Sequence, residues 1–149
     1  MPAVRQAVIV GLDKLQAKLK AHGAAVDKAI SVEIRKGAIA IQTTARLLIT
    51  NSPAGGNVYW FGKNRSIEHH ASAPGQPPAT NTGHLQTNIQ TVIDPDDSRI
   101  AYVVSRAHYS FWLEYGTEHM KARPFMHPAY RQHRDEIVTR VRAAARAAR

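Results

Sequence analysis

Residues 25–50 repeat apolar side chains with the period of an α-helix, and this stretch constrains the fold more than any other. At about 100° per residue, the apolar side chains fall on one stripe. The stripe consists of Val26, Ile30, Ile34, Ala38, Ile41, Ala45 and Leu48. The opposite face carries Lys28, Arg35, Gln42 and Arg46. The pattern predicts one long helix over residues 25–50, ended by Asn51-Ser52-Pro53, that needs a partner surface along its stripe.

Three further apolar side chains of this helix, Val32, Ile39 and Leu47, lie off the stripe. One interpretation is that they are ordinary exposed residues, which every protein surface carries. The other is that they form a surface for a partner, because a helix that is apolar on two sides usually has something against both. The sequence leaves both interpretations open, and Val32 and Ile39 are therefore candidates for a subunit interface.

The N-terminal segment, residues 1–24, predicts a short strand followed by a helix. The apolar run contains Val4, Val8, Ile9 and Val10, and Gly11 and Asp13 cut it too short for a signal peptide. Leu12, Leu15 and Leu19 then follow helical spacing. Gly23 is the predicted end of this first helix.

Residues 51–84 are rich in Gly and Pro and predict an extended loop without regular structure. The run Tyr59, Trp60, Phe61 is too apolar for a free linker, so we expect an arm that buries this run, on a neighbouring subunit. The stretch 73–79 favours polyproline II, which loses less entropy on docking than a flexible loop. Its prolines, Pro74, Pro77 and Pro78, are further interface candidates.

Residues 85–126 predict a β-hairpin, an aromatic turn and a third strand. Alternation over 85–93 and 99–105 indicates two strands, and Asp94-Pro95-Asp96-Asp97 between them is turn chemistry. Residues 107–115 predict a short aromatic helix or turn, closed by Gly116, and 117–126 a loop leading into a possible strand.

The last segment, residues 127–149, predicts a basic helix over 128–148, with Arg142, Arg146 and Arg149 on one face. The whole chain has a formal net charge of +9, and the excess lies at its two ends, because residues 51–130 carry six basic and six acidic side chains. Such a balance favours nucleic acid or an acidic partner, although a basic helix face can also be simply solvated.

No standard catalytic pattern is present, since GxSxG, a P-loop, GxGxxG and HExxH are all missing. The chain has no cysteine, which excludes disulfides and thiol chemistry and favours a reducing cytosol. Its histidines lack ligand spacing. Glu114, beside an aromatic cluster, is better interpreted as holding a turn than as a catalytic carboxylate. We expect no enzyme, no cofactor, no metal site and no membrane span.

Three segments together resemble a known family. They are Ser72-Ala73-Pro74-Gly75-Gln76-Pro77-Pro78-Ala79 with Thr82-Gly83-His84-Leu85, then Tyr109-Ser110-Phe111-Trp112-Leu113-Glu114-Tyr115-Gly116-Thr117, and Ala122-Arg123-Pro124-Phe125-Met126-His127-Pro128-Ala129. Their order and spacing, over about residues 25–145, resemble the tail-completion, or head–tail joining, proteins of long-tailed bacteriophages and prophages. The stretch from Gly55 to His70 is longer than a minimal linker in that pattern.

The resemblance implies a non-enzymatic virion protein, assembled in the host cytoplasm, that forms a ring, typically a hexamer, at the neck or the top of the tail. Double-stranded DNA passes through this ring without sequence recognition, and neighbouring neck, connector and tail proteins are partners. The implied fold is α+β, a single domain over 1–149. It has a small antiparallel sheet, made of the hairpin and one or two further strands, packed against two longer helices, with a long extended loop.

Within that fold the motif residues are expected to shape turns: Thr82, Gly83, Leu85, Glu114, Gly116, Thr117, Arg123, Pro124 and Phe125. Gly116 can take a positive φ, and Arg123 before Pro124 is pushed to an extended backbone, where Glu114 could pair with its guanidinium. The arginines 142, 146 and 149 are candidates to line the DNA channel or to face an acidic partner. The alternative function is a stand-alone basic nucleic-acid-binding protein.

Overall fold

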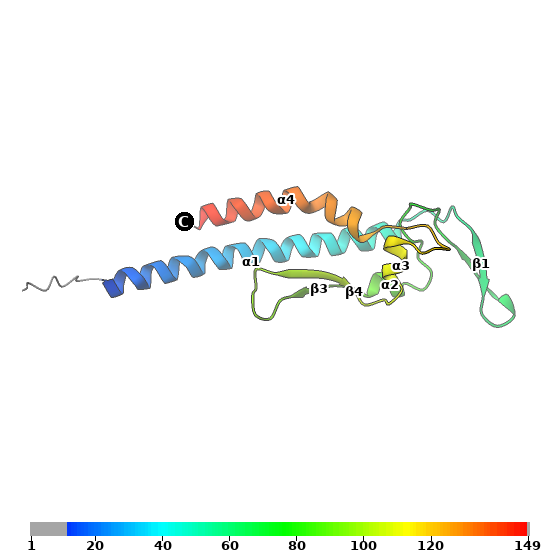
Figure 1. Cartoon of the computed structure of the whole chain (residues 1–149), viewed down its shortest axis with the longest axis horizontal. Coiled ribbons are helices and arrows are strands. Elements are labelled where there is room, and N and C mark those ends of the chain that lie inside the picture. The colour runs from blue at the N-terminus through cyan, green and yellow to red at the C-terminus, as the bar shows by residue number, and fades with distance from the viewer. Residues whose placement is uncertain (1–11, 149) are drawn as a thin grey trace, which may run out of the picture.

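The computed structural model describes residues 12–148, and its longest element is α1, Leu12–Thr50 (Figure 1). The predicted end at Gly23 is wrong, because α1 runs through this position without a break. A Cβ at Gly23 would meet no atom within 4 Å, so the glycine costs only its helix propensity, about 1 kcal/mol. With 39 residues, α1 is about 58 Å long. The strand expected in residues 4–10 lies outside the described residues.

The apolar stripe of α1 is partly buried: Ala38 and Ala45 are 5% and 0% exposed, and the other five residues of the stripe are half-buried. The second long helix, α4, Met126–Ala147, packs along α1 and begins two residues before the predicted start. The two helices approach most tightly at Gly37, where a Cβ would lie 2.6 Å from Cγ1 of Ile137.

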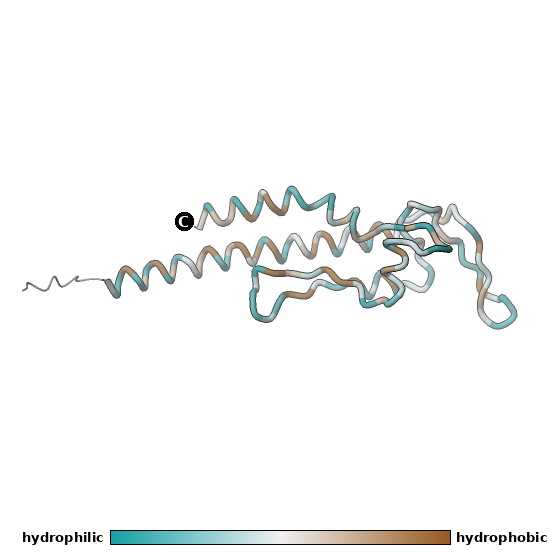
Figure 2. The backbone as a smooth tube through the Cα atoms, viewed as in Figure 1, coloured by the Kyte–Doolittle hydropathy of each residue, from teal (hydrophilic) through white to brown (hydrophobic). Residues whose placement is uncertain are grey.

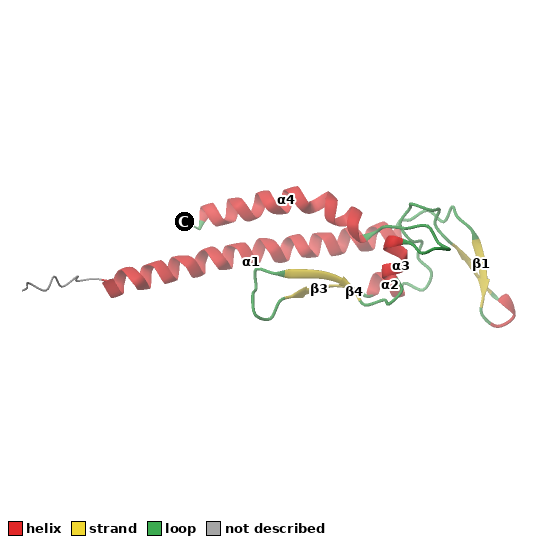
Figure 3. Cartoon of the chain, viewed as in Figure 1, coloured by secondary structure: helices red, strands yellow, loops and turns green. Residues whose placement is uncertain are grey.

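The predicted central hairpin is confirmed as β3, Ile89–Ile93, and β4, Ala101–Ser105, paired antiparallel with Thr91 opposite Val103. It packs on α1 (Figure 3). Gln42 Nε2 and Arg46 Nη2 donate to the carbonyl oxygen of Ile89, at 3.1 and 2.6 Å. Two of the four polar side chains that the helical pattern placed opposite the stripe, Gln42 and Arg46, therefore hold the first strand.

The first strand of this hairpin is shorter than predicted, because residues 84–87 form a helical turn, α2, His84–Thr87. Gly83, with φ 75°, precedes it, and the Thr82 hydroxyl accepts from the backbone N–H of His84 at 3.4 Å. These two residues thus bend the chain as expected, but into a helical turn and not directly into a strand.

The arm contains regular structure, which corrects the prediction of an irregular loop. Strands β1, Val58–Phe61, and β2, Ile67–His70, pair antiparallel around the short turn η1, Lys63–Arg65. Aromatic and β-branched residues favour strands. The reversal uses three positive φ values, at Gly62, Asn64 and Arg65. Figure 1 shows this hairpin projecting from the end of the molecule opposite to the start of α1.

The aromatic helix is confirmed as α3, Ser110–Tyr115, and Gly116 follows it with φ 81°. The prediction of a third strand is wrong, because the described chain bends between residues 117 and 125 and forms no strand there. The N–H of Arg123 donates to the carbonyl oxygen of Leu113 at 2.6 Å. The backbone here is thus bonded to α3, which leaves it unavailable for a sheet.

The described part of the chain is α+β, with two small antiparallel hairpins and two longer helices. Its core is small and lies where the C-terminal half of α1 meets the other elements: Ala45, Ile49, Leu85, Ile89, Ala107, Phe125 and Ala129. Apolar residues recur along α1, β3 and β4 (Figure 2). Toward its N-terminus α1 leaves Leu15 and Leu19 exposed, at 54% and 62%.

Candidate subunit interface

The arm exposes all four residues of β1, and apolar side chains occur on both of its faces. Cross-strand pairing puts Tyr59 beside His69 and Phe61 beside Ile67 on one face. On the other face lie Val58 and Trp60, opposite His70 and Glu68. Tyr59 is 49% and Trp60 53% exposed. The predicted run Tyr59-Trp60-Phe61 is therefore not buried within its own chain.

The two segments of the arm stay paired down to its base. The N–H of Gly56 donates to the Ala71 carbonyl at 2.8 Å, and the N–H of Ala71 donates to Asn57 at 3.0 Å. Ser72 is fully buried, and a Cβ at Gly56 would come within 2.3 Å of its carbonyl oxygen.

The Pro-rich segment packs mainly on its own chain. Pro78 is buried, and Pro77 is half-buried, with its carbonyl oxygen accepting a hydrogen bond from the Ser52 hydroxyl. Of these three prolines, only Pro74 is exposed. The Thr80 hydroxyl donates to the Ile49 carbonyl at 3.2 Å, at the end of α1.

An open apolar groove of about 670 Å³ runs along α1. Ile34, Ala38 and Ile41 of α1 form its floor. The other residues that line it come from β4, α3 and α4: Ala101, Val103, Glu114, Tyr115, Met126, His127, Tyr130 and Ile137. Sequence reasoning missed this groove, because its walls are far apart in the chain.

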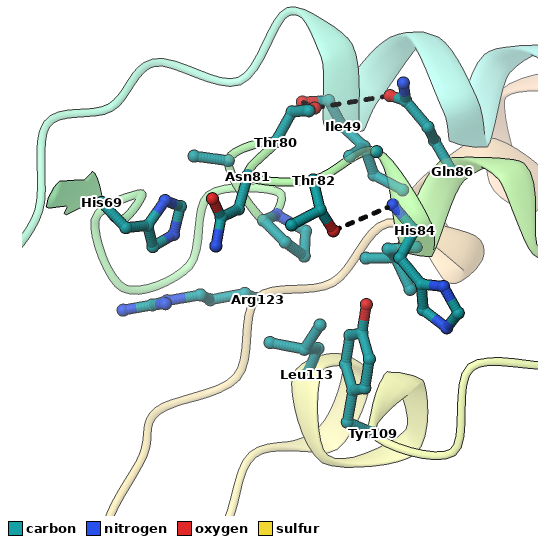
Figure 4. Close-up of a pocket in the computed structure, with 14 residues that line it drawn as sticks. Ile49, His69, Thr80, Asn81, Thr82, His84, Gln86, Tyr109, Leu113 and Arg123 are labelled. Carbon is teal, nitrogen blue, oxygen red and sulfur yellow. Dashed lines mark hydrogen bonds between the residues drawn. The ribbon is translucent and has the colours of Figure 1, made fainter. Parts of the chain in front are cut away.

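A second, smaller pocket of about 250 Å³ lies at the base of the arm, where residues of all three motif segments meet (Figure 4). Pro78, Thr82, Gly83, Leu85, Leu113 and Arg123 line it. Figure 4 shows the Arg123 side chain stretched toward His69, and its Nε is buried without a hydrogen-bond partner. The motifs that carry the resemblance are thus joined in space at the root of the arm.

The expected pairing of Glu114 with Arg123 is wrong, because Glu114 caps α4 instead. Its carboxylate accepts the backbone N–H groups of Phe125, Met126 and His127 at 2.9, 2.9 and 2.8 Å. The first four N–H groups of a helix have no partner inside the helix. The fourth position here is Pro128, which has no N–H. The Glu114 side chain therefore accepts every backbone N–H that the start of α4 leaves without a partner.

The remaining motif residues shape the chain between α3 and α4. A Cβ at Gly116 would lie 2.8 Å from the Met120 carbonyl oxygen, which leaves no room for another residue. The Thr117 hydroxyl accepts the N–H groups of His119 and Met120 at 3.2 and 3.1 Å. Phe125 is fully buried in the core, and Pro124 is half-buried.

Two further groups of apolar side chains are exposed, one on α1 and one on α3. Val32, Ile39 and Leu47 of α1 are 43%, 49% and 51% exposed, and they do not line the groove. On α3, Phe111, Trp112 and Tyr115 are exposed as well, which no sequence pattern predicted. The exposure follows from the packing of α3, because this short helix contacts the core on one side, through Leu113.

Charges cluster in two other places. Arg142 and Arg146 are exposed on α4, and no acidic side chain pairs with either within residues 12–148; Arg149 lies outside the described residues. The turn between β3 and β4 is acidic. Hydrogen bonds from Arg99 lower the pKa of Asp97 to about 2, and the N–H groups of Asp96 and Asp97 lower that of Asp94.

None of the helices between Leu12 and Ala147 has the length and apolar character of a membrane span. Across the described positions, no three or more His, Asp or Glu side chains gather as they would around a metal ion. Comparison of the chain with protein-family models, with curated proteins and with solved structures found no match.

Proposed function

We propose that this protein is a non-enzymatic structural subunit of a bacteriophage virion. In this role it forms a ring at the neck or the top of the tail, joins tail to head and lets double-stranded DNA pass. The observation that carries the proposal is the projecting β1–β2 hairpin, which exposes apolar side chains on both of its faces. Contiguous exposed apolar surface of this kind marks a site of protein association.

The amount of exposed surface supports association. The chain exposes 11055 Å², whereas a compact monomer of 16.4 kDa exposes about 7,500 Å². The difference is about 3,500 Å². Subtracting the surface of an unfolded chain for the twelve residues that the structure does not describe still leaves about 1,600 Å² more than a compact monomer exposes. A standard interface buries about 800 Å² per partner, so each subunit can supply two faces, as a ring requires.

The motif order supports the choice of ring. The SAPGxPP, TGxL, aromatic-Glu-aromatic-Gly-Thr and ARPF segments, which resemble the head–tail joining family, converge at the root of the arm. In the proposed assembly they hold the arm at a fixed angle to the body of each subunit. Neighbouring neck, connector and tail proteins are the expected partners beyond the ring itself.

The decisive experiment is electron microscopy of phage particles produced without this protein. We expect full heads and complete tails that do not unite, and restored joining when the protein is supplied. Intact, infectious particles made in its absence would overturn the proposal.

The exposed Arg142 and Arg146, with the net charge of +9, favour a second candidate, a stand-alone nucleic-acid-binding protein. Sizing together with a DNA-binding titration against salt separates the two. Large assemblies with weak DNA binding support the ring. A monomer with tight binding that falls steeply with salt supports the alternative.

A further inference from the structure

We propose that the β1–β2 hairpin of one copy of this chain inserts into the groove between α4 and β4 of a second copy. The inference rests on the proposed function, since it names the contact that would build the ring. Four observations carry it: the two apolar faces of the hairpin, the lining of the groove, the charges at the ends of both, and the position of the arm in its own chain.

A hairpin with apolar side chains on both faces fits a groove better than a flat surface, and the two polar side chains on one of its faces, Glu68 and His70, bind each other at 2.9 Å. On a flat surface, one of the pairs Phe61–Ile67 and Val58–Trp60 would remain in water. In a groove with a floor and two walls, both faces lose water. An isolated two-stranded hairpin is only marginally stable in water, so docking would also stabilise the arm itself.

The groove offers the matching chemistry. Its floor and walls are mostly apolar, and among its lining residues only Glu114 and His127 carry titratable groups apart from the tyrosines. The Glu114 carboxylate already accepts three N–H groups at the start of α4. An inserted aromatic side chain therefore meets no unpaired charge at this carboxylate. β1 spans about 13 Å and β4 about 17 Å, so β1 is short enough to lie along β4.

The charges at the two tips are opposite. The tip of the arm carries Lys63 and Arg65 and no acidic residue. The turn that leads into the β4 wall carries Asp94, Asp96 and Asp97, and Arg99 is the one basic residue there. An arm that lies along β4 with its tip toward this turn sets a charge of +2 against −2.

The arm cannot reach the groove of its own chain. Figure 1 shows the hairpin beyond the C-terminal end of α1 and crosswise to it, while the groove is lined by residues from the middle of α1. The chain that leaves the arm is held on the body, because the N–H of Gly75 donates to the Ala122 carbonyl at 2.9 Å and the Thr80 hydroxyl donates to the Ile49 carbonyl at 3.2 Å. The contact therefore joins two different surfaces of two copies. Such a head-to-tail contact generates a ring when its rotation closes.

A crosslink tests the contact directly, because the chain has no cysteine of its own. In the double variant Ser66→Cys with Ser98→Cys, one new thiol lies at the exposed tip of the arm and the other in the exposed turn between β3 and β4, and both aromatic anchors remain. We expect mild oxidation to produce a ladder of covalent oligomers on a non-reducing gel. The matched control replaces Ser98→Cys by Val138→Cys, which is exposed on α4 outside the groove and should give no ladder.

Two surface variants test the energetics. Trp60→Asp on the arm and Tyr130→Asp on the groove wall should each weaken self-association at least about 30-fold in sedimentation, as loss of a central aromatic anchor does. A mixture of the two should form a dimer that grows no further, because one intact arm still meets one intact groove. Val138→Asp should associate like the wild type. Lys63→Glu should weaken assembly, and Asp96→Lys in the same chain should restore part of the loss.

The outcomes separate this inference from the proposed function. If the wild type forms oligomers but the Ser66–Ser98 pair gives no ladder, the arm-in-groove contact is wrong and the ring proposal stands. A crosslink within one monomer, or a wild type that stays monomeric at all concentrations, also overturns the contact. Particles that join without the protein overturn the function whatever the crosslink shows.

Discussion

At the scale of single residues, Glu114 has the most clearly defined role. Its carboxylate connects the end of α3 to the first N–H groups of α4, and Pro128 removes the remaining donor. The negative charge also lies at the positive end of the helix dipole. The ARPF segment and the aromatic segment thus depend on each other through one side chain.

We therefore expect Glu114→Ala to lower the free energy of unfolding by about 2 kcal/mol or more, because it leaves half-buried N–H groups without a partner. Urea denaturation measures this loss. Glu118→Ala, at an exposed carboxylate in the same connection, should cost less than about 0.5 kcal/mol. An ion pair with Arg123 would instead make Glu114→Ala and Arg123→Ala equally costly and the double variant no worse than either.

Asp97 gives the β3–β4 turn a dependence on pH. Because Arg99 lowers its pKa to about 2, below the ordinary 3.8, its contribution is fully present above pH 4 and is lost as the pH falls through 2. We expect Asp97→Asn to be less stable than the wild type at pH 6 and the difference to vanish near pH 2. Acid unfolding of both proteins, followed by circular dichroism, tests this. A difference that stays constant over this range would contradict it.

At the scale of elements, the continuity of α1 distinguishes two glycines that look alike in sequence. Gly23 lies in an open, exposed part of the helix, whereas Gly37 lies against Ile137 of α4. The first can accept a side chain, and the second is the place where the two long helices meet.

We expect Gly23→Ala to stabilise the protein by about 0.5–1 kcal/mol, because alanine forms helix better than glycine and nothing obstructs its methyl group. If the helix ended at Gly23 with a positive φ, the same change would destabilise. Thermal unfolding gives the sign directly.

Gly37→Ala should have the opposite sign and cost about 1–3 kcal/mol, because its methyl group would lie 2.6 Å from Ile137 Cγ1. Adding Ile137→Ala removes the clash. The double variant should thus lose less free energy of unfolding than the two single variants lose together. If the two losses simply add, the helices do not meet at Gly37.

At the scale of the whole molecule, the chain is elongated, its core is small, and its basic and aromatic surfaces lie at different places. The core is near the C-terminal end of α1, the arm projects beyond it, and Arg142 and Arg146 lie near the end of α4, toward the other end of the molecule (Figure 1). Contacts between copies and contacts with DNA or an acidic partner can therefore be tested separately.

The basic face of α4 is expected to line the channel mouth or to meet an acidic neighbour. Arg142→Glu with Arg146→Glu should leave self-association unchanged but reduce DNA retention or particle joining. If both arginines contact phosphates, the slope of binding against salt should fall by about 1.8. Retention and joining that both remain at wild-type level would exclude this role for the two arginines.

The sequence predicted elements wherever one local signal was strong. The stripe from Val26 to Leu48, the Asp-rich turn of the hairpin and the aromatic turn closed by Gly116 were all correctly placed. Prediction from the sequence failed where the local structure depends on contacts with residues that are distant in the chain. Gly23 was predicted to end a helix that continues, and the arm was predicted to be irregular although its aromatic run pairs with residues 67–70.

By itself, the sequence determined the two long helices, the central hairpin and the motif order, because periodicity and turn chemistry act over a few neighbouring residues. Only the tertiary structure decided that Glu114 caps α4 and does not pair with Arg123, and that Gln42 and Arg46 hold Ile89. It also brought β4 and α4 together as the walls of one groove. The partners in these hydrogen bonds are 11 positions apart for Glu114 and Phe125 and 47 for Gln42 and Ile89. Packing in three dimensions determines such partners, and a local sequence pattern does not contain that information.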